Sequence, residues 1–287
     1  MHQRASASMH RRIGADLAGQ GDITMEPRLP ATMCFRVTRY CNARCGFCLA
    51  PPDGVHPDVG LLKQRVDWLV AHGMRTVHFC GGEPTIHPGL AELLVHARAG
   101  GCATRLTTNG IALPDRLLAA LRATGTTVKL SLHGDQAHHD AIVGRPAFDL
   151  ATAHLREMLV ARVPTTVQTT IVAGGEWVLD WMAEHCLQLG VRRLSILPFI
   201  PRGSGAQTED RYGLTTAQRT QLRERVRRKR LALLGRLDVR WLDFASQALP
   251  VVEADGRVVL ERASEALDTV IAVMPGPVVL RKRVAVA

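Results

Sequence analysis

The sequence lacks the features of a membrane or secreted protein. No apolar run approaches the roughly 18 uninterrupted residues that a spanning helix needs. Residues 1–22 contain Arg and His but no apolar core of the kind found in a signal peptide. The seven cysteines are odd in number and irregularly spaced, which does not indicate a disulfide framework. No segment repeats or is low in complexity. These absences predict a globular protein of the reducing cytoplasm without a membrane partner.

A regular alternation of short β-branched runs and amphipathic stretches begins at residue 34. The predicted strands are 34–38, 75–80, 103–109, 127–134, 165–172 and 193–200, and the helices lie near 59–72, 88–99, 114–123, 147–162 and 176–189. Because parallel strands need a crossover connection, which a helix supplies, these units predict a parallel sheet. The expected fold class is α/β, a partial (β/α)6 TIM-like barrel with a small C-terminal α+β extension.

Three regions follow from this pattern. Residues 1–31 are polar and aperiodic and predict a mobile arm, and residues 32–210 form the predicted core. Residues 211–287 form the extension, with a helix near 215–234, a strand at 237–244 and a hairpin at 251–261. The dipeptide Asp255-Gly256 is a strong turn signal within that hairpin, and the chain becomes irregular after it.

Three cysteines follow the first predicted strand, at Cys41, Cys45 and Cys48. A structural zinc site usually has four protein ligands in two pairs, and the neighbouring sequence supplies no second CxxC or HxxxH. Iron-sulfur clusters also normally take four thiolates, so three thiolates would leave one iron open to an outside ligand. Zinc or inert cysteines remain the alternative interpretation.

This triad resembles the CxxxCxxC loop of the radical S-adenosylmethionine (radical SAM) superfamily, including the aromatic residue before the last cysteine. Further motifs occur in the order of that family, each near the end of a predicted strand. They are Gly81-Gly82-Glu83-Pro84, Thr107-Thr108-Asn109-Gly110, Ser131-Leu132-His133-Gly134, Ile196-Leu197-Pro198 and Ile200-Pro201-Arg202-Gly203. The resemblance covers about residues 34 to 205.

The resemblance implies two cofactors, one [4Fe-4S] cluster held by Cys41, Cys45 and Cys48, and S-adenosylmethionine chelated to the fourth iron. Electron transfer from the reduced cluster would cleave S-adenosylmethionine and give a 5′-deoxyadenosyl radical that abstracts hydrogen from a substrate. Such chemistry requires that water be excluded, which a barrel mouth closed by loops can provide.

The resemblance also assigns residues to S-adenosylmethionine. Gly81, Gly82, Glu83 and Pro84 would contact the methionine amino group, and Asn109 and Ser131 the ribose or the carboxylate. Phe47 would pack against adenine, while the backbone of Leu197 and Pro198 would pair with its edge. Asn109-Gly110 could equally form a plain turn, and Ser131 could be an ordinary small residue inside the barrel.

Three polar residues are candidate substrate contacts. His133 lies at the carboxyl end of a predicted strand, where barrel enzymes keep their sites, although a capping role is the alternative. Gln168 shares one strand face with Thr170. Arg202 could bind an anion such as a substrate carboxylate. The four other cysteines, Cys34, Cys80, Cys102 and Cys186, are expected to be buried and inert, and His138-His139-Asp140 to begin a helix.

The C-terminal region resembles the SPASM or twitch extension of radical SAM peptide and sulfatase modifiers, but without its cysteines. No cysteine follows Cys186, so we expect no auxiliary cluster there, and this favours redox-neutral reactions. The main hypothesis is a radical SAM enzyme acting on a small nucleoside-like or sugar-like metabolite. The alternatives are a maturase of a ribosomal peptide and, in another class, a structural metal-binding or RNA-directed protein.

The net charge of +10 is concentrated in one segment. Residues 211–236 hold nine basic side chains and one acidic one, Glu224. Leu222, Val226, Leu233 and Leu234 would face the barrel while the cationic side chains extend into solvent. The helix is either a solvated face or a docking site for an acidic electron donor of flavodoxin or ferredoxin type. No added RNA-binding module is legible, so nucleic acid is an improbable partner.

Overall fold

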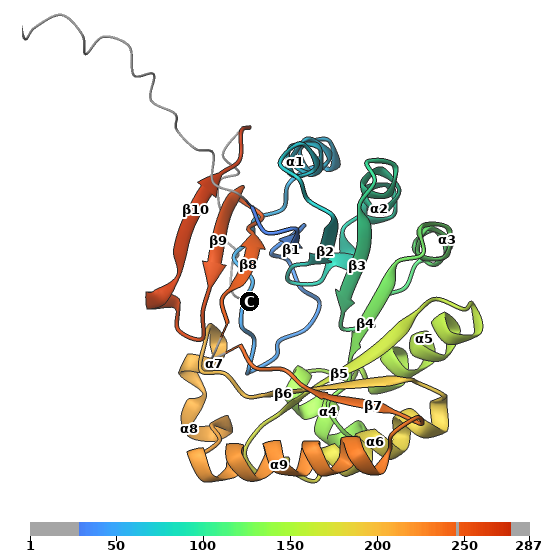
Figure 1. Cartoon of the computed structure of the whole chain (residues 1–287), viewed down its shortest axis with the longest axis vertical. Coiled ribbons are helices and arrows are strands. Elements are labelled where there is room, and N and C mark those ends of the chain that lie inside the picture. The colour runs from blue at the N-terminus through green and yellow to red at the C-terminus, as the bar shows by residue number, and fades with distance from the viewer. Residues whose placement is uncertain (1–28, 245–246, 277–287) are drawn as a thin grey trace, which may run out of the picture.

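The computed structural model describes residues 29–244 and 247–276, in which ten strands form one curved sheet (Figure 1). The order across the sheet is β10-β9-β8-β1-β2-β3-β4-β5-β6-β7. The core strands are β1 (Thr32–Arg36), β2 (Thr76–Cys80), β3 (Ala103–Thr108), β4 (Thr127–Ser131), β5 (Thr165–Ile171) and β6 (Arg193–Pro198). They lie within a few residues of their predicted positions and pair in parallel. The predicted α/β fold with a parallel central sheet is confirmed.

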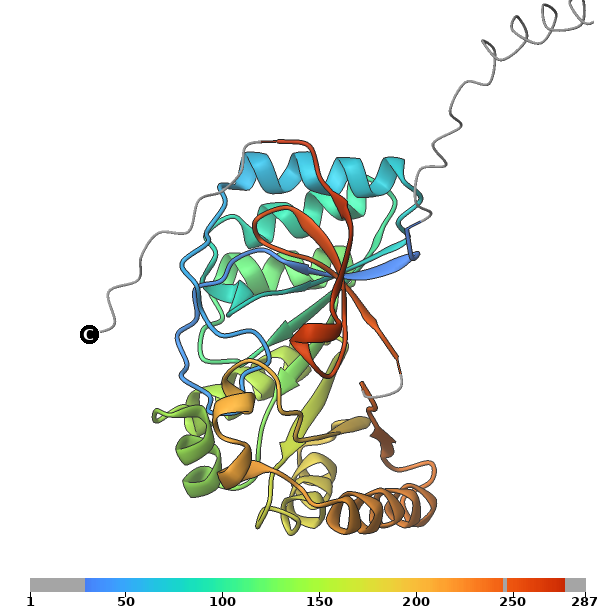
Figure 2. The same ribbon diagram turned by 90° about the vertical axis from the view of Figure 1, so that its left-hand side faces the viewer.

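Helices connect successive strands and cover the outer face of the sheet (Figures 1 and 2). They are α1 (Val59–Ala71), α2 (Leu90–Ala99), α3 (Asp115–Thr124), α4 (Gln136–Val143), α5 (Phe148–Val160) and α6 (Val178–Leu189), with a 3₁₀ turn η1 (Pro84–Ile86) after β2. Side chains that point outward from the strands, such as Phe35, Phe79 and Leu130, are completely buried under these helices. This interface forms the hydrophobic core.

The region after β6 extends the sheet at both edges. Two short helices, α7 (Ser204–Gln207) and α8 (Glu209–Tyr212), lead to the basic helix α9 (Thr216–Ala232) and to β7 (Asp238–Trp241), which pairs in parallel with β6. At the other edge, β8 (Leu249–Val252) pairs in parallel with β1, followed by β9 (Arg257–Glu261), the turn η2 (Glu265–Leu267) and β10 (Thr269–Val273). The C-terminal strands therefore lie along the flank of the barrel sheet.

The predicted hairpin is confirmed as β8 and β9, which are antiparallel. Gly256 has φ of 101°, a backbone conformation that glycine adopts without strain, and its N–H donates to the Glu253 carbonyl. Strand β10 was not expected from the sequence. Leu222 and Val226 are buried as predicted, but the same prediction is wrong for Leu234, which lies beyond the end of α9 and is 78% exposed. The boundaries of the three predicted regions stay a prediction, and most of the proposed N-terminal arm and residues 277–287 lie outside the described residues.

Within residues 29–244 and 247–276, no helix is both long enough and apolar enough to span a bilayer.

Candidate functional site at the carboxyl ends of the strands

The loop that carries Cys41, Cys45 and Cys48, here called the cysteine loop, connects β1 to α1 and is held in place by the segment that contains α7 and α8. The Ser204 N–H donates to the Cys48 carbonyl at 2.9 Å, and the Thr208 hydroxyl donates to the Gly46 carbonyl at 2.8 Å. A Cβ atom on Gly46 would lie only 2.7 Å from the Tyr212 ring. The chain after β6 therefore fixes the path of the loop that carries the three thiols.

The three thiols are close enough to influence one another electrostatically. Burial raises the pKa of Cys41 and of Cys45 to about 12, and the neighbouring thiols contribute to both shifts. Burial also raises the pKa of Cys48. Each thiol would keep its proton unless a metal centre replaced it.

The three thiols of the loop are compatible with ligation of an iron-sulfur cluster. In the part of the chain that the structure describes, no group of three or more His, Cys, Asp or Glu side chains converges tightly enough to hold one metal ion. A [4Fe-4S] cluster binds each thiolate on a different iron, so its cysteines need not reach a common point. Three half-buried thiols in one loop, Cys41, Cys45 and Cys48, meet that requirement.

The two glycines after β2 allow that turn to pack directly on the cysteine loop. The Gly82 N–H donates to the Thr38 carbonyl and the Glu83 N–H to the Tyr40 carbonyl, both at 2.8 Å. An added Cβ would lie 2.4 Å from the Thr38 oxygen at Gly81 and 2.1 Å from the Tyr40 oxygen at Gly82. These glycines are thus needed for the contact between two loops of the protein itself.

Glu83 is buried below this turn, where hydrogen bonds from three neighbouring residues hold its carboxylate. Its carboxylate accepts from the N–H and hydroxyl of Thr85, the hydroxyl of Thr108 and the N–H of Asn109, at 2.7 to 3.0 Å. Burial nevertheless raises the pKa of Glu83. Pro84 occupies the first position of η1, which Glu83 caps. The Asn109 amide donates to the Asn42 side chain at 2.7 Å and so joins the turn after β3 to the cysteine loop.

The ends of β4, β5 and β6 complete the rim. Ser131 and Gln168 are register partners on β4 and β5, and both are half-buried. Leu197 and Pro198 end β6 and are buried. Of the predicted S-adenosylmethionine contacts, the structure therefore places Gly81, Gly82, Glu83, Asn109 and Ser131 around one end of the barrel, with Leu197 and Pro198 at the far strand.

His133 follows β4 and is held by its neighbours. Thr170 N–H donates to His133 Nδ1 at 3.1 Å, so the Nε2 atom carries the proton. The Phe47 ring meets the His133 ring edge to face, with centroids 4.9 Å apart, and the His139 ring stacks at 5.6 Å. Burial, with a smaller effect of His139, holds the pKa of His133 well below its usual value. His133 is therefore a neutral hydrogen-bond donor at neutral pH.

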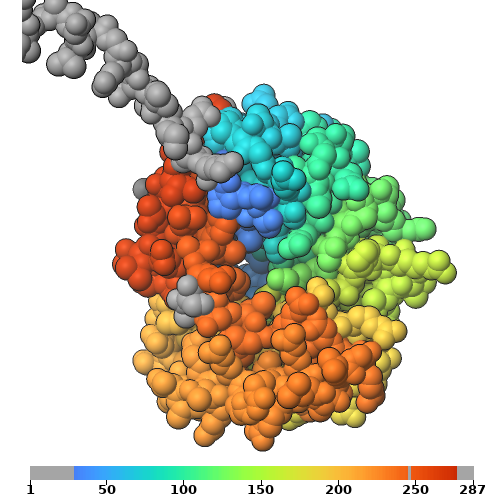
Figure 3. Space-filling model, viewed as in Figure 1, coloured from blue at the N-terminus to red at the C-terminus, as the bar shows by residue number. Residues whose placement is uncertain are grey.

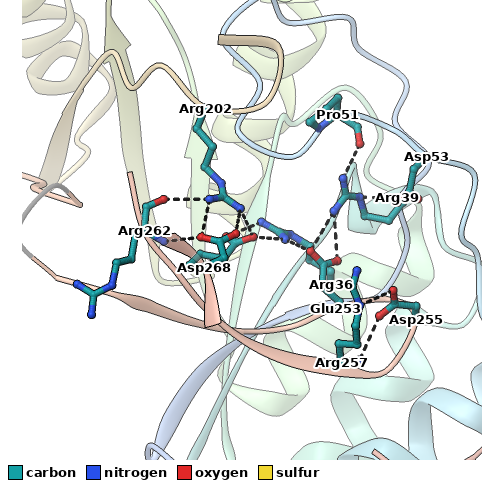
Figure 4. A network of polar contacts seen from close by, with 11 residues as sticks. Arg36, Arg39, Pro51, Asp53, Arg202, Glu253, Asp255, Arg257, Arg262 and Asp268 are labelled. Carbon is teal, nitrogen blue, oxygen red and sulfur yellow. Dashed lines mark hydrogen bonds and ion pairs between the residues drawn. The ribbon is translucent and has the colours of Figure 1, made fainter. Parts of the chain in front are cut away.

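Arg202 lies in a buried network of charges that joins the core to the C-terminal strands (Figure 4). Its guanidinium donates to Glu261 and Asp268 at 2.7 to 2.9 Å and to the Arg262 carbonyl at 3.0 Å. Arg36 at the end of β1 binds Glu261 and Glu253. The anions that Arg202 binds here are the protein's own, and a contact with a substrate anion stays a prediction.

The inward face of the barrel is open (Figure 3). Several of the polar side chains that strand alternation turns inward are only half-buried, in contrast with the completely buried outward residues, although Arg36 on the same face is buried. This set is Cys34, His78, Cys80, Lys129, Ser131 and Gln168.

Cys102 and Cys186 are buried as expected, but the expectation of burial is wrong for Cys34 and Cys80, because alternation on β1 and β2 directs them into the lumen. Two shallow depressions near Arg192 and Arg236 lie at the opposite, amino ends of β6 and β7.

Sequence reasoning missed several residues that shape the site. The bonds from Arg36 to Glu253 and Glu261 join residues more than 200 positions apart, and no local pattern connects them. Asn42 lies within the cysteine motif, where its type gave no signal. His139, which the sequence placed at a helix start, is indeed on α4, but its Nδ1 also accepts from the His133 N–H at 3.2 Å.

Comparison with protein families gives one match, in which the model of the radical SAM superfamily covers residues 35–188. A PqqA peptide cyclase from Streptomyces rochei is 30% identical over 212 residues, which are 72% of this chain and 58% of the relative. Mycofactocin maturase MftC from Mycolicibacterium smegmatis is 29% identical over 67% of this chain and 50% of its own. A GTP 3′,8-cyclase from Chlorobaculum tepidum is 33% identical over 57% of this chain and 52% of its own. The chain spans about half the length of the curated relatives it matches.

Solved structures share the fold. Streptococcus suis SuiB bound to precursor peptide SuiA has a TM-score of 0.71 at 15% identity, covering 82% of this chain and 60% of SuiB. The anSMEcpe protein with bound AdoMet and the Kp18Cys peptide has a TM-score of 0.66 at 15% identity, covering 81% of this chain and 74% of the other. At this identity the similarity extends to the architecture only.

Proposed function

Because the chain belongs to the radical SAM superfamily, we propose that it modifies a peptide by radical chemistry. The family makes it an enzyme that uses a [4Fe-4S] cluster and S-adenosylmethionine. The proposal concerns the substrate, for which the peptide alternative is better supported than the small metabolite that was the main expectation from the sequence.

The observation that carries the proposal is the extent of the matches. The PqqA peptide cyclase aligns with 72% of this chain and the mycofactocin maturase with 67%, whereas the GTP cyclase aligns with 57%. The peptide-modifying relatives thus share more of the chain than the nucleotide cyclase does.

The residues at the carboxyl ends of the strands have roles consistent with such an enzyme. When bound, the cluster and S-adenosylmethionine supply a carbon radical, and Cys41, Cys45 and Cys48 would hold the cluster. The Oε2 atom of Glu83 accepts a hydrogen bond from the Asn109 N–H, and a carboxylate oxygen has further acceptor capacity that an amino group could use. His133 presents a neutral N–H beside Phe47. An open lumen admits a side chain of a peptide, while loops at the rim limit the entry of water.

The test begins with anaerobic reconstitution of iron and sulfide, followed by dithionite and S-adenosylmethionine. We expect 5′-deoxyadenosine from the wild type and none from Cys45→Ala. Synthetic versions of short peptides encoded beside the gene are then added, and GTP is tested in parallel. A mass change in one peptide that requires S-adenosylmethionine would support the proposal. Turnover of GTP with no change in any peptide would assign the enzyme to the nucleotide class instead.

A further inference from the structure

The inward side chains of β1 and β2 form a cluster of two thiols and an imidazole. Cys34 Sγ lies 3.8 Å from His78 Nδ1, and His78 Nε2 lies 2.7 Å from the Thr107 hydroxyl. Cys34 and His78 are register partners on adjacent strands, and Cys80 lies two residues further along β2. The Cys80 thiol is within hydrogen-bonding reach of Cys34. None of these residues is part of the cysteine loop.

The position of Cys80 brings it close to the reacting centre. It is the last residue of β2 and directly precedes the Gly81-Gly82-Glu83 turn that packs on the cysteine loop. Its side chain is only half-buried even though it lies within the sheet. Strand alternation turns it toward the inside of the barrel, on the same face as His78. A group bound at that turn would meet Cys80 from the inner side of the barrel.

The two thiols share their protons unequally. The hydrogen bond from Cys80 lowers the pKa of Cys34, and His78 and Arg36 add to the effect against the opposing effect of burial. The same hydrogen bond and burial raise the pKa of Cys80. Of the two thiols, Cys80 is therefore the one that holds its S–H hydrogen more tightly. Lys129 lies near enough to both sulfurs to interact with their charge.

We propose that Cys80 is a catalytic hydrogen-atom donor that quenches a carbon radical in the lumen, and that the neighbouring sulfur of Cys34 stabilises the sulfur radical that remains. The S–H bond is much weaker than the O–H bond of an aliphatic hydroxyl, so a thiol transfers a hydrogen atom to carbon where the hydroxyl of serine or threonine does not. The inference rests on the radical chemistry of the family and, for its peptide substrate, on the function proposed above.

The step is balanced in atoms and electrons. A C–H bond forms on the substrate as the S–H bond of Cys80 breaks, so the carbon radical is reduced and the sulfur is oxidised to a thiyl radical. One electron from the low-potential donor that also reduces the cluster, together with one proton from solvent, restores the thiol. Removal of a hydrogen atom followed by its return is redox-neutral for the substrate, and on a peptide it would invert a stereocentre.

A substrate-free experiment isolates this thiol. The reconstituted enzyme in D₂O is given dithionite and S-adenosylmethionine alone, and the 5′-deoxyadenosine is analysed by mass spectrometry. Because the Cys80 thiol exchanges with solvent, we expect wild-type enzyme to form singly deuterated 5′-deoxyadenosine. In Cys80→Ser, whose hydroxyl also exchanges but is a poor hydrogen-atom donor, the deuterated fraction of the product should fall to background. Cys102→Ser and Cys186→Ser remove buried thiols outside the lumen and should retain the label.

A second measurement needs no cluster. In the anaerobic cluster-free protein, Cys34 should react with iodoacetamide faster than Cys102 or Cys186, and Cys80→Ser should change its rate. The proposal is overturned if Cys80→Ser incorporates as much deuterium as wild type, or if Cys34 is as unreactive as Cys102. The two proposals fail in different ways. If a fully loaded wild-type enzyme forms no 5′-deoxyadenosine, the proposed function is wrong. If 5′-deoxyadenosine forms and its deuterium content does not depend on Cys80, only the role of Cys80 is wrong.

Discussion

Single atoms decide how the turn after β2 meets the cysteine loop. At Gly82 an added Cβ would lie 2.1 Å from the Tyr40 oxygen and 2.6 Å from its carbonyl carbon, and both are backbone atoms that cannot rotate away. We expect Gly82→Ala to displace the chain just before Cys41 and so reduce the iron and sulfide retained after reconstitution. Iron and sulfide assays with the visible absorption spectrum measure this.

A matched control is Gly100→Ala, at the end of α2. Its Cβ would come no closer than 3.3 Å to a methyl group of Val70, a side chain that can adjust, and its φ of −73° suits alanine. We expect wild-type cluster content there. Equal cluster loss in both variants, or none in Gly82→Ala, would mean that the close approach at Gly82 does not position the cysteine loop.

Individual residues of the candidate site were the most predictable part of the structure. Cys41, Cys45, Cys48 and the Gly81–Pro84 turn could be found because their types and spacing are local and chemically unusual. The inward direction of Cys34 and Cys80 could have been predicted from strand alternation, since Cys34 shares a strand face with Arg36 and Cys80 shares one with His78. What the sequence could not supply is the distance between a side chain on β1 and one on β2, which depends on register and twist.

Among the elements, the C-terminal strands are joined to the barrel by both main-chain pairing and buried charge. β8 pairs with β1, and Arg36 and Arg202 reach across to Glu261. The sequence predicted the β8–β9 hairpin from its turn, because that signal is local. It did not predict that the hairpin would join the core sheet, because the pairing of β8 with β1 connects residues more than 200 positions apart and leaves no periodic signature.

Asp268, which directly follows η2, provides a test of this junction. Burial would raise the pKa of Asp268, but hydrogen bonds from Arg202 and the Arg262 N–H outweigh it and lower the pKa. The ionised carboxylate therefore stabilises the fold above the unfolded pKa of about 3.9, and this contribution is lost as the pH falls through the lower folded pKa. We expect Asp268→Asn to lower the free energy of unfolding by about 1–2 kcal/mol at pH 7.

Urea unfolding followed by circular dichroism measures that difference. The gap between wild type and Asp268→Asn should be constant from pH 7 to pH 5 and should narrow below about pH 4. Asp67→Asn, which removes an exposed carboxylate on α1 that contacts His96, is the control and should cost much less. A gap that widens on acidification would contradict the proposed pairing of Asp268 with Arg202.

Across the molecule, most of the excess positive charge lies on one outer helix, α9, and the segments beside it. Arg225 and Lys229 bind Asp180 on α6 and so attach α9 to the barrel. Arg227 and Arg228 remain 64% and 67% exposed, although both lie near Glu224. Exposed positive charge attracts an acidic protein and raises the rate at which the two meet, and added salt weakens this attraction. The rate at which an acidic electron donor reduces the cluster therefore distinguishes a docking face from a merely solvated surface.

We expect the double substitution Arg227→Glu with Arg228→Glu to slow reduction of the cluster by an acidic flavodoxin and to leave reduction by dithionite unchanged. Stopped-flow absorbance of the cluster follows both rates, and the flavodoxin rate of the wild type should fall as salt is raised. The control, Arg98→Glu with Arg122→Glu, makes the same change in net charge on the exposed surfaces of α2 and α3. If both double variants slow the flavodoxin reaction equally, only the net charge matters and α9 is not the docking face.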